Sequence, residues 1–122
     1  MSTVLVVDDD KIILNVTEEL LNMLGYEVCT AQSGEVALEI VSSKKNRIDL
    51  ALLDISLPDM DGLTLFPKLL AKQPDLKILL TSGNLLEISE ESLKQQGVEG
   101  FLQKPYSFKV LKSTLEKLLS AN

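Results

Sequence analysis

The sequence predicts an α/β fold in which five parallel strands alternate with five helices. Short apolar runs recur along the chain, and helical apolar spacing fills the stretches between them. The chain has 122 residues, and 45% of them are hydrophobic. A chain of this size and composition builds one core, so we expect residues 1–122 to form a single domain. Strands that alternate with helices pair in parallel through right-handed crossovers. The predicted strands are Val4–Val7, Glu27–Thr30, Ile48–Leu53, Leu76–Leu80 and Gly100–Leu102.

Each predicted helix is recognised by its apolar spacing or by the residue that ends it. The first ends at Gly25, the third near Pro74, and the fourth, Leu86–Gln96, at Gly97. The fourth helix is mostly polar, so few of its residues can hold it on the sheet. The apolar stripes of the other four consist of Ile12, Ile13, Val16, Leu20 and Leu24; Val36, Ala37, Ile40 and Val41; Leu63, Phe66, Leu69 and Leu70; and Leu111, Leu115, Leu118 and Leu119.

The composition restricts the chemistry that this chain can perform. It has no histidine, which excludes a Ser-His-Asp triad, a His-ligated zinc site and a phosphohistidine within this chain. A net charge of −6 argues against direct binding to nucleic acid. A single cysteine, Cys29, allows no intrachain disulfide and fits a cytoplasmic location. We expect no membrane insertion, because no apolar run approaches ~20 residues and the first residues lack a secretory signal.

The first predicted strand runs directly into three carboxylates, Asp8, Asp9 and Asp10. Two unit charges ~4 Å apart repel each other by about 4 kcal/mol at an effective dielectric constant of ~20. One acid would suffice to cap the following helix. Three acids therefore indicate a bound cation that offsets their repulsion.

Polar side chains also follow three other predicted strands. The third strand ends at Asp54, the fourth at Thr81 and Ser82, and the fifth at Lys104 before Pro105. The carboxyl ends of parallel strands meet at one edge of an open sheet, where ligands bind. Carboxylate oxygens suit Mg²⁺, and a carboxylate can be a nucleophile towards a phosphoryl group whose charge Mg²⁺ and a lysine neutralise. The residues thus predict magnesium-dependent phosphoryl transfer, with Thr81 as a further hydrogen-bond donor.

Taken together, these motifs resemble those of the response-regulator receiver domain over the whole chain. "VLVVDDD" is similar to the family's acidic pair, "LLDISLPDMDG" to its phosphoacceptor segment, "LLTSG" to its hydroxyl-bearing strand end and "GFLQKP" to its Lys-Pro end. The resemblance implies a doubly wound sheet in the flavodoxin-like order 2-1-3-4-5 with helices on both faces. It also implies Asp54 as phosphoacceptor, with Thr81 and Lys104 contacting the phosphoryl group.

The resemblance further implies a metal site and a switch. Mg²⁺ would be held by Asp8, Asp9, Asp54 and the backbone carbonyl of Ser56. Phe101 falls where the family places a rotating aromatic that reports the state of Thr81, although packing into the core is an equal alternative for this side chain.

Three positions depart from the family's usual pattern. Ser56, two residues after the acceptor, and Gly83, two residues after Thr81, are unusually small, which leaves the hydrolysis rate open. Tyr106 is a mild variant of a common Phe.

The function that the resemblance implies is a phosphoacceptor signalling switch of a two-component phosphorelay, not a metabolic enzyme. A sensor histidine kinase or histidine phosphotransfer domain would donate a phosphoryl group to Asp54. The face around the last two helices would then change, and slow autodephosphorylation would end the signal. "GFLQKPY" is similar to receivers attached to hybrid sensor kinases. The sequence does not specify the downstream protein or attached output domain.

Three other functions remain as alternatives. A haloacid-dehalogenase-type enzyme could use Asp8 as nucleophile and Asp10 as its second acid, but the chain is short and has no cap region or later acidic pair after a strand. Phosphorylation of Asp8 would favour that enzyme, and phosphorylation of Asp54 the receiver. A flavin-binding module would place three acids against its phosphate. A degenerate receiver used only for docking is disfavoured, because each key position is present.

Overall fold

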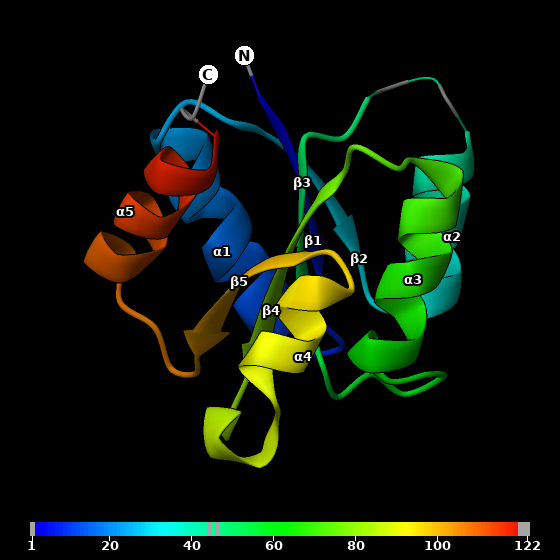
Figure 1. The fold of residues 1–122 in the computed structure, drawn as a ribbon. Coiled ribbons are helices and arrows are strands. Elements are labelled where there is room, and N and C mark those ends of the chain that lie inside the picture. Colours follow the sequence, from blue (N-terminus) through cyan, green and yellow to red (C-terminus); the bar gives the residue numbers. More distant parts are fainter. Residues whose placement is uncertain (1, 44, 46, 120–122) are drawn as a thin grey trace.

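A computed structural model, which describes residues 2–43, 45 and 47–119, shows the predicted α/β fold (Figure 1). Its five strands are all parallel and lie in the order β2-β1-β3-β4-β5, as expected. The strands are β1 (Thr3–Val7), β2 (Glu27–Ala31), β3 (Leu50–Asp54), β4 (Lys77–Ser82) and β5 (Val98–Gln103).

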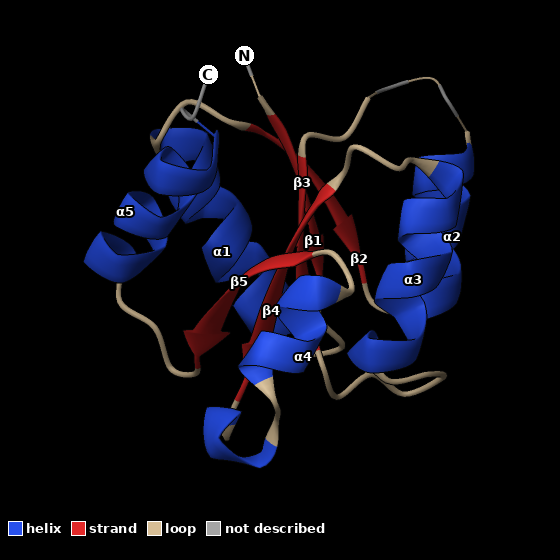
Figure 2. Ribbon diagram, viewed as in Figure 1, coloured by secondary structure: helices blue, strands red, loops and turns tan. Residues whose placement is uncertain are grey.

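Helices cover both faces of this sheet (Figure 2). α1 (Lys11–Met23) and α5 (Phe108–Leu119) pack on one face, whereas α2 (Gly34–Ser42), α3 (Gly62–Lys72) and α4 (Glu90–Gln95) pack on the other. Side chains alternate along each strand, so Val4 and Val6 join the first layer and Leu5 and Val7 the second. Burial on both faces explains why the central strands are continuous apolar runs.

The third strand begins later than the sequence predicts. Ile48 is fully buried but is not part of β3, because the amide of Gln73 takes the place of a neighbouring strand. Gln73 Oε1 accepts a hydrogen bond from the Ile48 N–H at 3.3 Å, and Gln73 Nε2 donates to the Ile48 carbonyl at 2.5 Å. The backbone of Ile48 is thus satisfied by a side chain rather than by the sheet.

The single fourth helix predicted over Leu86–Gln96 is wrong in its first half. Leu85–Glu87 forms a short 3₁₀ helix, η1, and α4 begins only at Glu90. Ile88 between them is extended, and the Ser89 hydroxyl accepts a hydrogen bond from the Ser92 N–H at 3.4 Å. Ser89 is a helix N-cap, so it starts a new helix instead of continuing the previous turn.

Only part of the apolar surface of α1 packs against the core. The buried residues of this helix are Leu14, Thr17 and Leu21. Ile12 and Val16, which belong to the predicted stripe, are 74% and 51% exposed. α1 therefore presents apolar side chains to solvent as well as to the sheet.

Candidate functional site

Four of the polar side chains predicted for the site meet at the carboxyl edge of the sheet. Asp8 follows β1, Asp54 ends β3, Thr81 lies near the end of β4, and Lys104 follows β5. The parallel register sets Asp54 beside Thr81, and β1, β3, β4 and β5 are consecutive neighbours. Asp8, Asp54 and Thr81 are all buried. The sheet thus brings together residues that are far apart in the sequence.

Lys104 joins the two buried carboxylates. Its Nζ lies 2.6 Å from Asp8 Oδ2 and 2.9 Å from Asp54 Oδ2. Burial alone would lower the pKa of Lys104, but the hydrogen bonds and charges of Asp8 and Asp54 outweigh it and leave this pKa above its usual value. The ammonium therefore stays charged and offsets part of the repulsion between the acids.

Backbone N–H groups orient the remaining oxygens of both carboxylates. The Asp10 N–H donates to Asp8 Oδ1 at 2.9 Å, and the Ser56 N–H donates to Asp54 Oδ1 at 3.0 Å. Each carboxylate is thus held by a lysine on one oxygen and by a peptide on the other. This pairing fixes both side chains before any ligand binds.

The three consecutive acids divide into a helix cap, Asp10, and a pair, Asp8 and Asp9, that lies close to Asp54. Asp10 Oδ1 accepts hydrogen bonds from the N–H groups of Ile12 at 2.9 Å and Ile13 at 3.4 Å, so it caps α1. Asp8, Asp9 and Asp54 offer oxygen atoms that lie within 4.8 Å of one another.

These donors fit a hard divalent cation. Three carboxylates and the Lys104 ammonium leave a net charge of −2, and every side-chain donor is an oxygen, the ligand type that Mg²⁺ prefers. Asp9 is exposed, so the cluster is open to solvent on one side. The Ser56 carbonyl stays a predicted ligand, although its N–H already bonds Asp54.

The loop after Asp54 folds back closely on this residue. A Cβ at Gly62 would lie 2.6 Å from the Asp54 carbonyl oxygen, a distance that real Cβ atoms do not reach. The Gly62 N–H donates to the Ile55 carbonyl at 2.7 Å, and Asp61 caps α3 through the Thr64 N–H at 2.7 Å. The Asp61–Gly62 pair therefore closes the loop and starts α3 next to Asp54.

Asp59, absent from the predicted site, ties the same loop to α2. Its two carboxylate oxygens accept hydrogen bonds from the N–H groups of Gly34 and Glu35, both at 2.9 Å. These backbone hydrogen bonds hold the pKa of Asp59 below its usual value. Asp59 follows Pro58 in a loop, where no periodic pattern distinguishes it from an ordinary acidic turn residue, so its contact with α2 could not be predicted from the sequence.

Thr81 and Phe101, the two residues of the predicted switch, both contact neighbouring parts of the fold. The Thr81 hydroxyl donates to the Leu53 carbonyl at 3.3 Å, so its proton is engaged with the backbone of β3. Phe101 is half-buried and packs against the apolar layer of α2, α3 and α4. This contact agrees with the core-packing alternative, and the rotating role of Phe101 stays a prediction.

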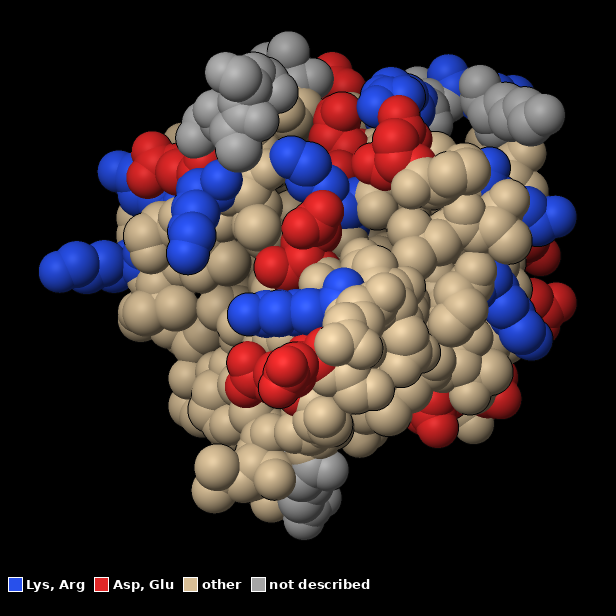
Figure 3. Space-filling view, in the orientation of Figure 1, with Lys and Arg blue, Asp and Glu red and all other residues tan. Residues whose placement is uncertain are grey.

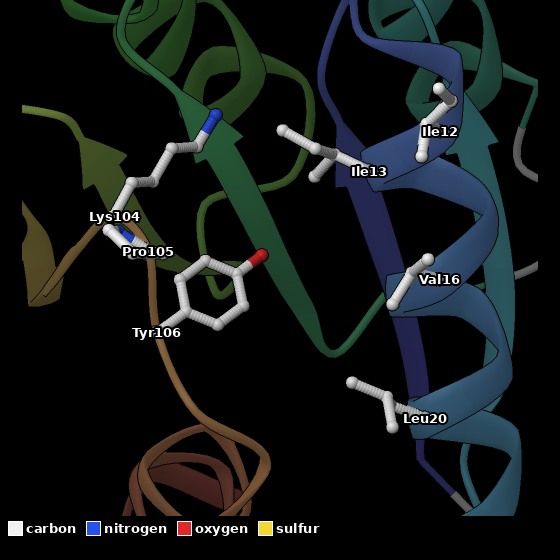
Figure 4. Close-up of a pocket in the computed structure, with 7 residues that line it drawn as sticks. All are labelled: Ile12, Ile13, Val16, Leu20, Lys104, Pro105 and Tyr106. Carbon is white, nitrogen blue, oxygen red and sulfur yellow. The ribbon is translucent and has the colours of Figure 1, made fainter.

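An apolar groove adjoins the site (Figure 4). It runs between α1 and the loop after β5, where the Lys104–Pro105 peptide is cis. The Tyr106 and Thr17 hydroxyl oxygens lie 3.4 Å apart and link the two walls. Burial raises the pKa of Tyr106, which keeps this hydroxyl protonated. The lining residues are Ile12, Ile13, Val16, Leu20, Lys104, Pro105 and Tyr106.

Outside this site the surface carries mixed charge. On the face drawn in Figure 3, acidic and basic side chains are interspersed, and the basic ones do not gather into a single large patch. Among the described residues, no helix is long and apolar enough to cross a membrane.

The chain matches known proteins over nearly its whole length. The response regulator receiver domain family matches residues 4–116. The sensor kinase CckA of Brucella abortus is 35% identical over 97% of this chain but only 12% of its own length. The transcriptional regulatory protein ZraR of Escherichia coli K12 is 37% identical over 96% of this chain and 26% of its own. The chain therefore spans a small part of these curated relatives.

Solved structures give the same result. The response regulator protein TrrA of Thermotoga maritima, in complex with Mg²⁺-BeF, has a TM-score of 0.83 and 33% identity, covering 98% of this chain and 100% of that one. The receiver domain of the hybrid histidine kinase CckA has a TM-score of 0.82 and 31% identity, and the match covers 97% of this chain and 99% of that one. With the sheet order, the acidic cluster and the family match in agreement, this chain belongs to the response regulator receiver domains of two-component signalling.

Proposed function

We propose that the domain is a phosphoacceptor switch that takes a phosphoryl group onto Asp54 from the phosphohistidine of a partner. The observation that carries this proposal is the placement of Lys104 between Asp8 and Asp54, with Asp9 close by. This cluster combines a nucleophilic carboxylate with a fixed cation and an oxygen-rich metal site. Phosphoryl transfer requires mainly such positioning and charge neutralisation.

In the proposed reaction, a carboxylate oxygen of Asp54 attacks the phosphorus atom of the phosphohistidine. The P–N bond breaks, its electron pair returns to the imidazole, and an acyl phosphate forms on Asp54. Bound Mg²⁺, held by Asp8, Asp9, Asp54 and the carbonyl of Ser56, would supply positive charge for the phosphoryl oxygens. The Lys104 ammonium, which contacts Asp54 Oδ2 in this structure, would then pair with the negative charge of the new phosphoryl group.

Thr81 would complete the response. Its hydroxyl, which now donates to the Leu53 carbonyl, would turn to donate to the acyl phosphate, and we propose that this turn displaces the chain that follows β4. α4 spans only six residues, and Leu93 is its one buried residue among those described, so this helix is weakly held. We propose that the face around α4 and α5 carries the change to a downstream protein or to an attached output domain, with Phe101 as the reporting aromatic.

The domain would catalyse its own phosphorylation and slow dephosphorylation without turning over a metabolite, so we propose a signalling rather than an enzymatic role. Water would reach the acyl phosphate past Ser56 and Gly83, both of which are exposed. Hydrolysis in line with the leaving carboxylate returns Asp54 to its resting state. A cytoplasmic location, in which Cys29 stays reduced, is part of the same proposal.

The partner that delivers the phosphoryl group must cover the residues around Asp54. The apolar groove ends at Lys104 itself, and its α1 wall exposes Ile12 and Val16 (Figure 4). Exposed apolar side chains beside a reactive site are typical of a protein contact. We therefore propose that the histidine-bearing surface of a sensor kinase or phosphotransfer domain docks on this groove. Two relatives, CckA and RcsC, are named as sensor kinases.

Acetyl phosphate with Mg²⁺ tests the proposal directly. The acyl phosphate is trapped by borohydride reduction and located by mass spectrometry, and Asp54→Asn serves as the matched variant. We expect label on Asp54 alone and none in the variant. Label on Asp8, or label that persists in Asp54→Asn, would instead favour a phosphatase of the haloacid-dehalogenase type.

A further inference from the structure

One side chain holds the loop that follows β4. The amide nitrogen of Gln103 donates to the Gly83 carbonyl at 2.6 Å and to the Lys104 carbonyl at 3.1 Å. Its amide oxygen accepts from the Leu85 N–H at 3.0 Å. The two donors and the acceptor of this amide are thus all engaged, and all with backbone groups. Gln103 is absent from the residues predicted for the site.

The hydrogen bonds of the Gln103 side chain extend the pairing between β4 and β5 beyond the end of the sheet. Ser82 is the last residue of β4 in register with β5, opposite Gln103, and the Lys104 N–H donates to the Ser82 carbonyl at 2.8 Å. After Ser82 the main chain leaves β5 and enters η1. Beyond the last backbone hydrogen bond between the two strands, the Gln103 side-chain amide bonds the backbone of Gly83 and Leu85. It therefore holds these two residues against the end of β5.

This position connects both residues that contact the proposed acyl phosphate. Gln103 is the neighbour of Lys104 in the chain, and Gly83 follows Thr81 by two residues. In this structure the Thr81 hydroxyl bonds the Leu53 carbonyl and Lys104 bonds the two free carboxylates. In the switch proposed above, the segment from Ser82 to Leu85 moves when Thr81 turns towards a phosphoryl group, and the hydrogen bonds of Gln103 oppose that movement.

We propose that Gln103 is a positioning residue that stabilises the resting conformation of the loop Gly83–Leu85 and thereby weakens phosphoryl binding at Asp54. The proposal rests on the function proposed above. A ligand that binds one of two conformations gains apparent affinity when the other is destabilised. Removing the Gln103 amide therefore shifts the equilibrium towards the conformation that binds the phosphoryl group.

The test measures binding of beryllofluoride, a phosphoryl mimic, in the presence of Mg²⁺. Gln103→Met keeps the length of the side chain and removes its three hydrogen bonds. Gln103→Ala removes the whole reach of the side chain, and Gln95→Met changes another exposed glutamine, on α4, as a control. Affinities come from amide chemical shifts in a titration, and the Leu85 amide shift reports whether its hydrogen bond is lost.

We expect both Gln103 variants to bind beryllofluoride at least threefold more tightly than the parent, and Gln95→Met to bind as the parent does. The Leu85 amide should shift in the Gln103 variants before any ligand is added. Unchanged or weaker binding in Gln103→Met, with the parent binding normally, overturns the role of Gln103 alone. If the parent itself neither binds beryllofluoride nor forms an acyl phosphate, the proposed function fails instead.

Discussion

Replacing Lys104 by methionine should destabilise the domain strongly, because this ammonium is the cation that the buried acids share. Asp8 and Asp54 offer oxygen atoms within 4.8 Å of each other, and Lys104 Nζ lies 2.6 Å and 2.9 Å from them. Two carboxylates at that separation repel each other by about 3.5 kcal/mol at an effective dielectric constant of ~20. Removing one partner of a buried ion pair costs about 3–5 kcal/mol. Because Lys104 keeps 19% of its side chain exposed, water can enter, and we expect about 3 kcal/mol.

Thermal and urea unfolding in EDTA would measure this loss. A change of about 3 kcal/mol corresponds to a fall in melting temperature of about 10 °C for a domain of this size. Lys109→Met, at an exposed lysine on α5, is the matched control and should change little. Adding Asp54→Asn to Lys104→Met removes one of the repelling charges, so the double variant should regain part of the stability. Mg²⁺ should likewise stabilise Lys104→Met, by about 2.7 kcal/mol at ~100 times its dissociation constant.

The pH dependence follows from the raised pKa of Lys104. A lysine whose pKa is higher in the folded state stabilises the fold below its unfolded value, near 10.5, and this stabilisation is lost as pH rises through the folded value. The difference between the parent and Lys104→Met should thus be complete at neutral pH and shrink above pH ~10.5. A variant within 1 kcal/mol of the parent in EDTA, or one that Asp54→Asn destabilises further, would refute this account of the site.

Three further predictions concern the acids and the open side of the site. Asp9→Asn should raise the melting temperature in EDTA and abolish the stabilisation by Mg²⁺; identical melting curves with and without Mg²⁺ in the parent would argue against a metal site. Ser56→Asn or Gly83→Glu should change the half-life of the acyl phosphate several-fold, because a barrier change of ~1.4 kcal/mol is tenfold in rate. A Cβ at Gly83 meets no atom within 4 Å, so Mg²⁺ affinity should not change, and decay at the parent rate in both variants would contradict the prediction. Asp59→Ala should lower the melting temperature at neutral pH; since the pKa of Asp59 is depressed in the fold, the difference from the parent should vanish as pH falls through that value, whereas a difference independent of pH would exclude the carboxylate bridge to α2.

The sequence predicts the strands and the acidic site because both depend on short patterns. A buried parallel strand is a run of apolar residues, and a parallel sheet carries the residues after each run to one edge. Asp8, Asp54 and Lys104 could therefore be placed together without knowing any contact between them. The family resemblance already assigned Asp8 and Asp9, and not Asp10, to the predicted metal site. That Asp10 caps α1 became clear only from the structure, because capping and metal binding use the same carboxylate chemistry.

The features that the sequence did not predict depend on single side chains bonded to a distant backbone. Gln103 bonds Gly83 and Leu85, about 20 residues earlier, and Asp59 bonds the start of α2. Such contacts leave no periodic pattern. The fourth helix was predicted too long because the residues from Leu86 to Gln96 have a helical composition throughout. Ser89 lies within this stretch, and its hydroxyl caps a new helix there. The stripe of α1 was visible, but periodicity cannot tell an exposed apolar face from a buried one.

Asp8 and Lys104 form an ion pair although 96 residues separate them along the chain, so the charged edge of the sheet is complete only when β5 is present. A growing or truncated chain that ends before β5 holds the acids of β1 and β3 without the ammonium that pairs with them. Such a fragment carries uncompensated negative charge at its carboxyl edge and leaves β4 as an edge strand, paired with β3 on one side only. In the function proposed above, competence for phosphorylation therefore requires the last strand, so a copy that lacks β5 would not compete with complete copies for phosphoryl groups.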